Sequence, residues 1–267
     1  MNLPRLLLLP LLCAVPSCTI SFGTENHSAE RQENFAFDPQ NALRLRVEDR
    51  NGSIEVRHGG PRIDAEVLFR ATAADPETAR DRVDRAEFTA HHEGDTLVLR
   101  VTHPDEERHV GARLTLQVPA GMRLDLDTSN AKIRVRDPYA NVVASTSNGS
   151  IDVDCAGGPA QLASSNGSVT LRGTPTSFDV TTSNASIHLD LDGDFAGDGS
   201  ARTSNGSISL ELGGLLHSGL STKTSNGKVS VDESLRAPSS FRGAGSSAHN
   251  VDLHTSNASI SVRQRGS

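Results

Sequence analysis

The chain has 267 residues, of which 35% are hydrophobic and only 3% aromatic, and its formal net charge at pH 7 is −7. This length fits one domain or one long repeat array. So few aromatic residues make a thin globular core, whereas a narrow array of short strands needs only small aliphatic side chains. Acidic and basic residues are interspersed, so we expect no nucleic-acid partner and no polybasic membrane anchor.

The N-terminus has the features of a secretory signal peptide over residues 1–17, MNLPRLLLLPLLCAVPS. Its apolar core, Leu6–Leu12, is too short to span a bilayer as a stable helix. Val15-Pro16-Ser17-Cys18 resembles a bacterial lipobox, in which Cys18 is lipidated and becomes the mature N-terminus. An ordinary signal-peptidase site would cut at the same bond and leave a soluble exported protein. We expect an exported envelope lipoprotein, at the outer membrane or the cell surface, that is held to the membrane by the lipid on Cys18.

The cysteines fit this expectation. Cys13 leaves with the signal peptide and Cys18 is acylated, so Cys155 alone remains and no intramolecular disulfide is expected. Cys155 follows a predicted strand and has no matching His signature near it, which indicates a small core residue rather than a nucleophile. Residues 18–34 are polar and carry no hydrophobic period, so we expect a lipidated N-terminus and a flexible tether.

Residues 35–123 are the least repetitive part and predict an N-terminal β-rich cap with the first coils. Strands are expected on both sides of Asn51-Gly52, over 63–72, in a hairpin around residues 93–95, and over 112–118 and 122–127 with a turn between them. Asp75–Arg85 starts with Asp-Pro and carries helix-forming residues, so we expect one short helix there. Such a cap covers the unpaired strand edges that the end of a repeat array exposes.

Residues 124–262 carry a repeated motif, whose clearest copy is STSNGSIDV at 145–153. Apolar residues alternate with period two before and after the central Asn, which predicts two half-buried strands per repeat. A constant period near 20 residues is typical of one supersecondary unit per repeat. The asparagines, spaced by 18, 18, 18, 21, 21 and 31 residues, are Asn130, Asn148, Asn166, Asn184, Asn205, Asn226 and Asn257.

Two geometries fit this motif, and in both the Asn-Gly pair turns the chain because both residues tolerate positive φ. In a hairpin the two strands pair with each other; in a β-solenoid the pair is a corner, and each strand pairs with the same strand of the next coil. Asn-Ala replaces Asn-Gly at Asn130, Asn184 and Asn257, and Ala is poor in a type I′ hairpin turn, so the pattern favours the solenoid. Coils stacked about 4.8 Å apart would let the Asn side chains bond to their own copies as a structural ladder. We therefore predict an all-β, single-chain β-solenoid with 18–21-residue coils.

The end of the chain departs from the regular spacing. Residues 232–250 form an insertion before the last motif copy, which we expect to be a surface loop. Residues 263–267 are the C-terminal tail. Its Arg263 and Arg265 are expected to put charge beside the terminal strand edge, which discourages end-to-end stacking.

Two groups of residues are candidates for metal binding. The alternating carboxylates of Asp190, Asp192, Asp194 and Asp198 in a Gly-rich segment are oxygen ligands of the kind Ca²⁺ prefers. They depart from the EF-hand pattern, because Phe195 stands where Gly is required and Ala201 where the bidentate Glu belongs; the alternative is a solvated turn. The second group, which fits no zinc signature and is expected to be a solvated loop, is His91, His92, Glu93, His103 and His109. We predict no catalytic residue, no cofactor and no established metal site.

The strand 112–118, the following Pro119-Ala120-Gly121 and the serial T-S-N-G-S-I units together are similar to a family of bacterial envelope proteins. This is the "putative adhesin" β-strand-repeat family, which is related to the GIN head domain of auto-transporter adhesins. The resemblance covers about residues 40–262. It implies a β-helix-like fold on exported, often lipid- or membrane-anchored proteins, and it brings no catalytic residues.

The predicted function is a non-enzymatic interaction module of the cell envelope or surface, with a glycan or protein ligand. One alternative is a carbohydrate-active β-helix enzyme, because a fold does not determine a function. The other is a periplasmic structural or sensory partner of a membrane complex.

Overall fold

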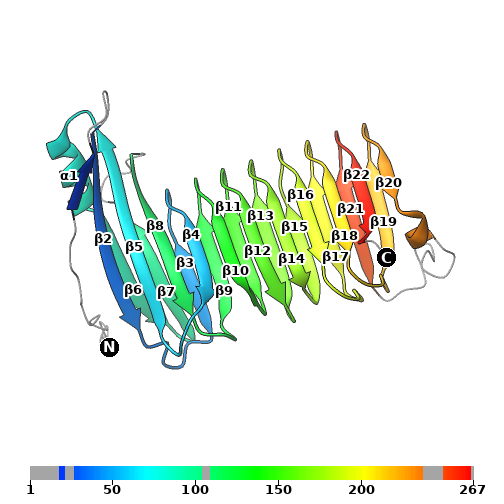
Figure 1. Cartoon of the computed structure of the whole chain (residues 1–267), viewed down its shortest axis with the longest axis horizontal. Helices are drawn as coiled ribbons and strands as arrows, with labels where there is room; N and C mark the ends of the chain where they lie inside the picture. The colour runs from blue at the N-terminus through cyan, green and yellow to red at the C-terminus, as the bar shows by residue number, and fades with distance from the viewer. Residues whose placement is uncertain (1–17, 22–26, 104–108, 237–248, 266–267) are drawn as a thin grey trace, which may run out of the picture. The chain divides into compact units, whose positions relative to one another are not determined.

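A computed structural model describes residues 18–21, 27–103, 109–236 and 249–265 (Figure 1). The expected signal peptide lies outside the described residues. The chain forms two compact units that divide between Thr128 and Ser129, slightly after the expected boundary at 123/124. No helix within the described ranges is long and apolar enough to cross a membrane.

The first unit is built from two sheets and one helix. One sheet has the strand order β1-β2-β5-β8-β4, with antiparallel pairs up to β8 and a parallel β8–β4 pair. The other has the order β6-β7-β3-β9, in which only the β6–β7 hairpin is antiparallel. The elements are β1 (Cys18–Ser21), β2 (His27–Phe37), β3 (Arg44–Glu48), β4 (Ile54–His58), β5 (Ile63–Ala73), α1 (Pro76–Asp84), β6 (Glu87–Glu93), β7 (Thr96–Thr102), β8 (Val110–Val118) and β9 (Arg123–Thr128).

The short helix α1 begins where the sequence predicts it. Asp75 is the N-cap, and its carboxylate accepts a hydrogen bond from the backbone N–H of Thr78 at 2.8 Å. This bond satisfies one of the N–H groups that the first helical turn leaves unpaired. The helix buries Ala79 and Val83 and contacts β2 and β5.

The prediction of a flexible tether is wrong for residues 27–34, which form most of β2. This strand pairs with β5 over its whole length. Its hydrophobic period is hidden because Arg31 occupies a position that other strands give to an apolar residue. The guanidinium carbon of Arg31 lies 4.5 Å from the centre of the Phe69 ring, and Arg31 Nη2 donates a hydrogen bond to the carbonyl of Ala86. A cation stacked on an aromatic face thus replaces an aliphatic contact.

The second unit consists of two parallel sheets, and every motif copy in it supplies strands to both. The strand before each Asn lies in one sheet and the strand after it lies in the other. Each strand pairs in parallel with the equivalent strand of a neighbouring copy, as Ile133, Ile151, Val169 and Ile187 do in register. The elements are β10 (Ile133–Tyr139), β11 (Val142–Thr146), β12 (Ile151–Ala156), β13 (Pro159–Ser164), β14 (Val169–Thr174), β15 (Ser177–Thr181), β16 (Ile187–Leu191), β17 (Gly199–Thr203), β18 (Ile208–Leu212), β19 (Gly219–Thr224), β20 (Val229–Val231), η1 (Glu233–Arg236), β21 (Asn250–Thr255) and β22 (Ile260–Gln264).

This pairing rules out the hairpin alternative for the second unit, because the two strands that flank an Asn do not pair with each other. The described fold is all-β with long parallel sheets, which is compatible with a β-solenoid. Inward residues of both sheets are buried except in the end strands β19 and β20, and each fully buried Val, Leu or Ile stabilises the fold by about 1.5–3 kcal/mol. Large and small side chains complement each other across coils: a Cβ on Gly199 would lie 2.3 Å from the Phe178 ring, so glycine makes room for this phenylalanine.

The order of the coils differs from the order of the motifs in the sequence. Strands β21 and β22, which carry the last motif copy, lie between the copy of Asn205 and the copy of Asn226. Figure 1 shows them in red between β17 and β18 on one side and β19 and β20 on the other. The expectation that Arg263 and Arg265 lie beside the terminal edge is therefore wrong.

The polarity of the inward side chains explains why the last motif copy lies inside the stack. The inward residues of the last copy, including Val251, Leu253 and Ile260, are apolar and fully buried. The copy that forms the open end is more polar, with Thr222 at an inward position. Its exposed Lys223 and Lys228 lie at the open edge, where lysine discourages the addition of further strands. Residues 233–236 of the expected surface loop form the short 3-10 helix η1.

The reason given for Asn-Gly at the corners is also wrong. None of the described corner residues has a positive φ; the glycines that do are Gly94, Gly121, Gly157, Gly173 and Gly193. The corner glycines instead permit close approach of neighbouring coils. A Cβ on Gly149 would lie 1.7 Å from the carbonyl oxygen of Ala131, and a Cβ on Gly206 would lie 1.7 Å from that of Ala185.

Candidate functional site

Corners of the second unit are held by a hydroxyl two residues before the Asn, which is buried in every such copy except that of Thr224. The hydroxyl of Thr146 donates to the carbonyl of Ala131 at 3.3 Å and accepts the N–H of Gly149 at 3.2 Å. One hydroxyl thus closes its own turn and ties it to the neighbouring coil. The equivalent donors, at 2.9–3.0 Å from their carbonyls, are Ser164, Thr182, Thr203, Thr224 and Thr255.

The asparagine side chains form a continuous row of hydrogen bonds along the same corner. Beyond Asn130, which only accepts, each Nδ2 donates to the Oδ1 of the preceding Asn in the row at 2.7–2.8 Å. The order of the row follows the stacking of the coils and is Asn130, Asn148, Asn166, Asn184, Asn205, Asn257 and Asn226. An amide has two N–H donors and two oxygen lone pairs, so an Asn inside the row uses one of each and presents the others to solvent.

We define the corner array as the exposed asparagines inside this row together with the serines that precede them. Its members are Ser147, Asn148, Ser165, Asn166, Ser183, Asn184, Ser204, Asn205, Ser256 and Asn257. Neighbouring coils of a parallel sheet lie about 4.8 Å apart, so the array repeats the same hydroxyl and amide at that interval. The ladder bonds and the hydroxyl residues two positions before each Asn fix this spacing.

The outer face of the sheet that contains β12 carries a group of paired charges. Asp152 lies within 4 Å of Lys132, Arg134 and Arg172. Burial alone would raise the pKa of Asp152, but the hydrogen bond from Arg172 and the charges of the three cations hold it below its usual value. The group has one negative and three positive charges, and its ion pairs join three neighbouring coils.

The four candidate calcium ligands do not share one site. Arg265 pairs with both Asp190 and Asp192. Asp194 accepts the N–H of Leu215 at 2.7 Å, and Asp198 accepts the N–H of Asn250 at 3.0 Å. These bonds, together with His217 beside Asp194 and His249 beside Asp198, lower the pKa of both carboxyls. Asp194 and Asp198 thus tie turns of neighbouring coils together, whereas Arg265, which follows β22, pairs with carboxylates two coils away.

The histidine candidates are also spread out. His91 Nε2 lies 2.9 Å from Glu93 Oε1 on β6. Burial and the charge of Arg50 lower the pKa of His103. Within the described part of the chain, no three His, Cys, Asp or Glu side chains gather closely enough to hold a metal ion.

The two cysteines of interest lie in strands. Cys155 is fully buried in β12, and burial raises the pKa of its thiol to about 11. A thiol in such surroundings is a poor nucleophile. Cys18, the expected lipidation site, is the first residue of β1.

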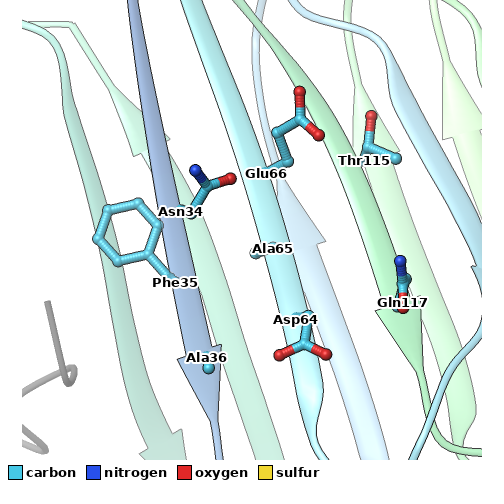
Figure 2. Close-up of a pocket in the computed structure, with 8 residues that line it drawn as sticks. All are labelled: Asn34, Phe35, Ala36, Asp64, Ala65, Glu66, Thr115 and Gln117. Carbon is cyan, nitrogen blue, oxygen red and sulfur yellow. The ribbon is translucent and has the colours of Figure 1, made fainter. Parts of the chain in front are cut away.

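A shallow hollow of about 290 Å³ lies on the outer face of β2, β5 and β8 in the first unit (Figure 2). Its polar lining residues are Asn34 on β2, Asp64 and Glu66 on β5, and Thr115 and Gln117 on β8. Gln32 donates to Glu66 at 3.1 Å. The alternation of residues in the sequence predicts that Asp64 and Glu66 lie on one face of β5. The hollow also needs β2 beside β5, and the sequence pattern did not predict that β2 is a strand.

No protein-family model matches this chain, and no curated protein matches it. Solved structures are similar to it over most of its length. One, described as a putative cell adhesion protein from Clostridium sporogenes, is 9% identical with a TM-score of 0.37 and covers 88% of this chain and 100% of that one.

Two others are described as putative adhesins. The Bacteroides fragilis structure is 10% identical, with a TM-score of 0.46 and coverage of 87% of this chain and 97% of that one. The Parabacteroides distasonis structure is 10% identical, with a TM-score of 0.44 and coverage of 88% and 97%. These descriptions match the family that the repeated motif resembles.

Proposed function

We propose that this chain is an exported, lipid-anchored β-solenoid that acts as a non-enzymatic interaction module of the bacterial cell envelope. Its contact face is the corner array, and its ligand is a polymer that presents hydroxyl groups at regular intervals, such as a glycan. The observation that carries this proposal is the in-register row of exposed Asn side chains, each hydrogen-bonded to its copies in the neighbouring coils, with a Ser before each one.

The array suits weak, repeated contacts. Its Asn side chains are held in place by the ladder, so little free energy would be lost in ordering them around a ligand. Each coil offers the same donors and acceptors, and several weak contacts on one polymer add up to a much stronger attachment. The array itself carries no charge, which favours neutral hydroxyl groups over ionic ligands.

Export and anchoring are supported by the N-terminal sequence, whose apolar core and Cys18 follow the pattern of a lipoprotein signal. The non-enzymatic assignment is supported by the positions of the groups with strongly raised pKa values. Burial raises the pKa of Asp49, Tyr139 and Cys155, and all three side chains are buried rather than exposed in an open cleft.

The test is binding of the exported chain, released from its anchor by Cys18→Ala, to immobilised cell-surface and cell-wall polysaccharides. The variant Ser147→Glu/Ser165→Glu/Ser183→Glu puts three bulky charges on the array without touching the buried hydroxyls. The control, Gln161→Glu/Ala163→Glu/Ser221→Glu, adds the same charge at exposed positions on the outer face of β13 and β19.

We expect the array variant to lose at least about tenfold in affinity, which corresponds to about 1.4 kcal/mol, while the control binds like the parent chain. Equal binding by all three chains would refute the contact face. Cleavage of a polysaccharide by the parent chain would refute the non-enzymatic assignment.

A further inference from the structure

Residues Asp49–Val56 of the first unit, DRNGSIEV, resemble the repeated motif but have an acid where the other copies have a hydroxyl. Asp49 stands two residues before Asn51, and its residue is only 5% exposed. In the next coil of the same unit, Thr128 fills this position and donates to the carbonyl of Gly52 at 3.0 Å. The hydroxyl residues at this position in the other copies are Thr146, Ser164, Thr182, Thr203, Thr224 and Thr255.

The surroundings of Asp49 match those of the hydroxyls. A Cβ built on Gly52 would lie 1.6 Å from the carbonyl oxygen of Ala112 and 2.0 Å from Asp49 Oδ2, so these two oxygens are at most 3.6 Å apart. Ala112 thus presents to Asp49 the carbonyl that Ala131 presents to Thr146. Asp49 Oδ1 accepts the N–H of Asn51 at 3.4 Å, whereas the buried Oδ2 has no hydrogen-bond partner among the described residues.

A hydroxyl at this corner both donates and accepts a hydrogen bond. An ionised carboxylate only accepts, so it would place a negative oxygen against a carbonyl oxygen. A protonated carboxyl restores both roles, with one oxygen as acceptor and the other as donor. We propose that Asp49 is a proton-operated latch: its protonated Oδ2 donates to the Ala112 carbonyl and fastens the corner between β3 and β4 onto β8, and loss of this proton to solvent releases the corner.

The charges around this corner leave burial as the main influence on Asp49. Glu48 on β3 is paired with Arg100 on β7 at 2.6 Å, Arg50 is exposed beside Asp49, and Arg113 on β8 and Asp127 on β9 are exposed as well. Burial raises the pKa of Asp49 to about 7, against the lowering effect of hydrogen bonds from the backbone N–H groups of Asn51 and Arg50. His103, beyond β7, has its own pKa lowered by burial and by Arg50.

The direction of the pH effect follows from these values. The unfolded chain would release the Asp49 proton near pH 3.9, whereas the folded chain holds it up to about pH 7. Stability from the latch is therefore complete below the unfolded pKa, falls as the pH rises towards 7, and is absent above it. Between about pH 5.5 and about pH 8.5 the equilibrium for opening this corner should rise about 30-fold.

The test measures amide hydrogen exchange of the β8 residues Val110–Leu116 by mass spectrometry, with rates corrected for the intrinsic effect of pH. Wild type is compared with Asp49→Thr, which restores the motif hydroxyl, with Asp49→Asn, which carries a neutral donor, and with Asp64→Asn, which removes an exposed acid on β5. Wild type and Asp64→Asn should lose about 30-fold in protection between about pH 5.5 and about pH 8.5, and both Asp49 variants should keep theirs.

A second measurement does not depend on the variants folding. The carboxyl carbon signal of Asp49 in the wild-type chain, followed by NMR, should titrate near pH 7. Titration below about pH 5, near the ordinary aspartate range, would overturn the latch, as would an equal pH dependence of exchange in wild type and Asp49→Thr.

Discussion

Replacing Thr203 by Val tests whether the corner hydroxyls stabilise the second unit. Thr203 is 5% exposed, and its hydroxyl donates to the carbonyl of Ala185 at 3.0 Å and accepts the N–H of Gly206 at 3.2 Å. Valine keeps the shape and adds apolar surface, but it can make neither bond. Thr203→Ser is the matched control, because Ser164 makes the same two bonds in another copy.

The magnitude follows from the burial of the groups left behind. An unsatisfied buried N–H such as that of Gly206 costs about 1–3 kcal/mol. The carbonyl of Ala185 is half-buried and can regain water, so we expect Thr203→Val to lose about 2 kcal/mol in all. Thr203→Ser loses only the methyl group, about 0.8 kcal/mol. The expected order of stability is Thr, then Ser, then Val.

Urea unfolding measures this order. Circular dichroism reports the strands, and the fluorescence of Tyr139, the single tyrosine of the chain, reports the buried interior of the second unit. Hydrophobicity alone predicts a different order, with Val the most stable, then Thr, then Ser. If Thr203→Val unfolds at the same or a higher urea concentration than Thr203→Ser, the hydroxyl row does not stabilise the corners.

Three further predictions concern the same unit. Leu189→Ala should lower the unfolding free energy by about 2–5 kcal/mol because the Leu189 side chain is buried. His188→Ala, on the outer face of the same strand, should change it by less than about 0.5 kcal/mol. Equal losses would contradict the assignment of inner and outer faces. Cys155 should react with iodoacetamide at about pH 8 only after unfolding in urea, and rapid labelling of the native chain would contradict its burial and raised pKa. A disulfide tests the order of the coils. Ser209 and Ser261 are register partners, so Ser209→Cys/Ser261→Cys should form a disulfide under mild oxidation, whereas Ser209→Cys/Ser230→Cys should not. The reverse result would mean that the coils stack in sequence order.

The repeat could be predicted in detail because its determinants are local. Alternating apolar residues on both sides of each Asn place the strands, and Asn-Ala in three copies favours corners over hairpins. The hairpin around residues 93–95 and the helix after Asp75 also follow from short-range signals, namely turn residues and an N-cap.

The order of the coils could not be predicted, because the copies TSNGKVSV and TSNASISV fit the same place in the stack. Which copy lies inside the stack depends on how much apolar surface each one buries. The copy with Val251 and Leu253 buries more apolar surface when neighbours cover both of its sides than the copy with Thr222 does. Strand β2 was missed for a different reason, since the contact of Arg31 with Phe69 hides its period.

The candidate site was predicted in part. The sequence indicates a row of stacked asparagines, but the role of the buried hydroxyls depends on which carbonyl each one meets in the neighbouring coil. Asp49 was not recognised for the same reason: only the folded corner shows that its Oδ2 lies against the Ala112 carbonyl. The hollow beside Asp64 and Glu66 depends on strands far apart in the sequence.

The most direct test of the proposed function is the position of the protein on intact cells. Metabolic labelling with a lipid precursor is combined with protease treatment of intact cells, for wild type and for Cys18→Ala. The proposal predicts that wild type is labelled through Cys18 and is removed by the protease, and that Cys18→Ala is unlabelled. A labelled protein that the protease cannot reach would face the periplasm and contradict the surface role, and an unlabelled wild type would contradict the lipid anchor.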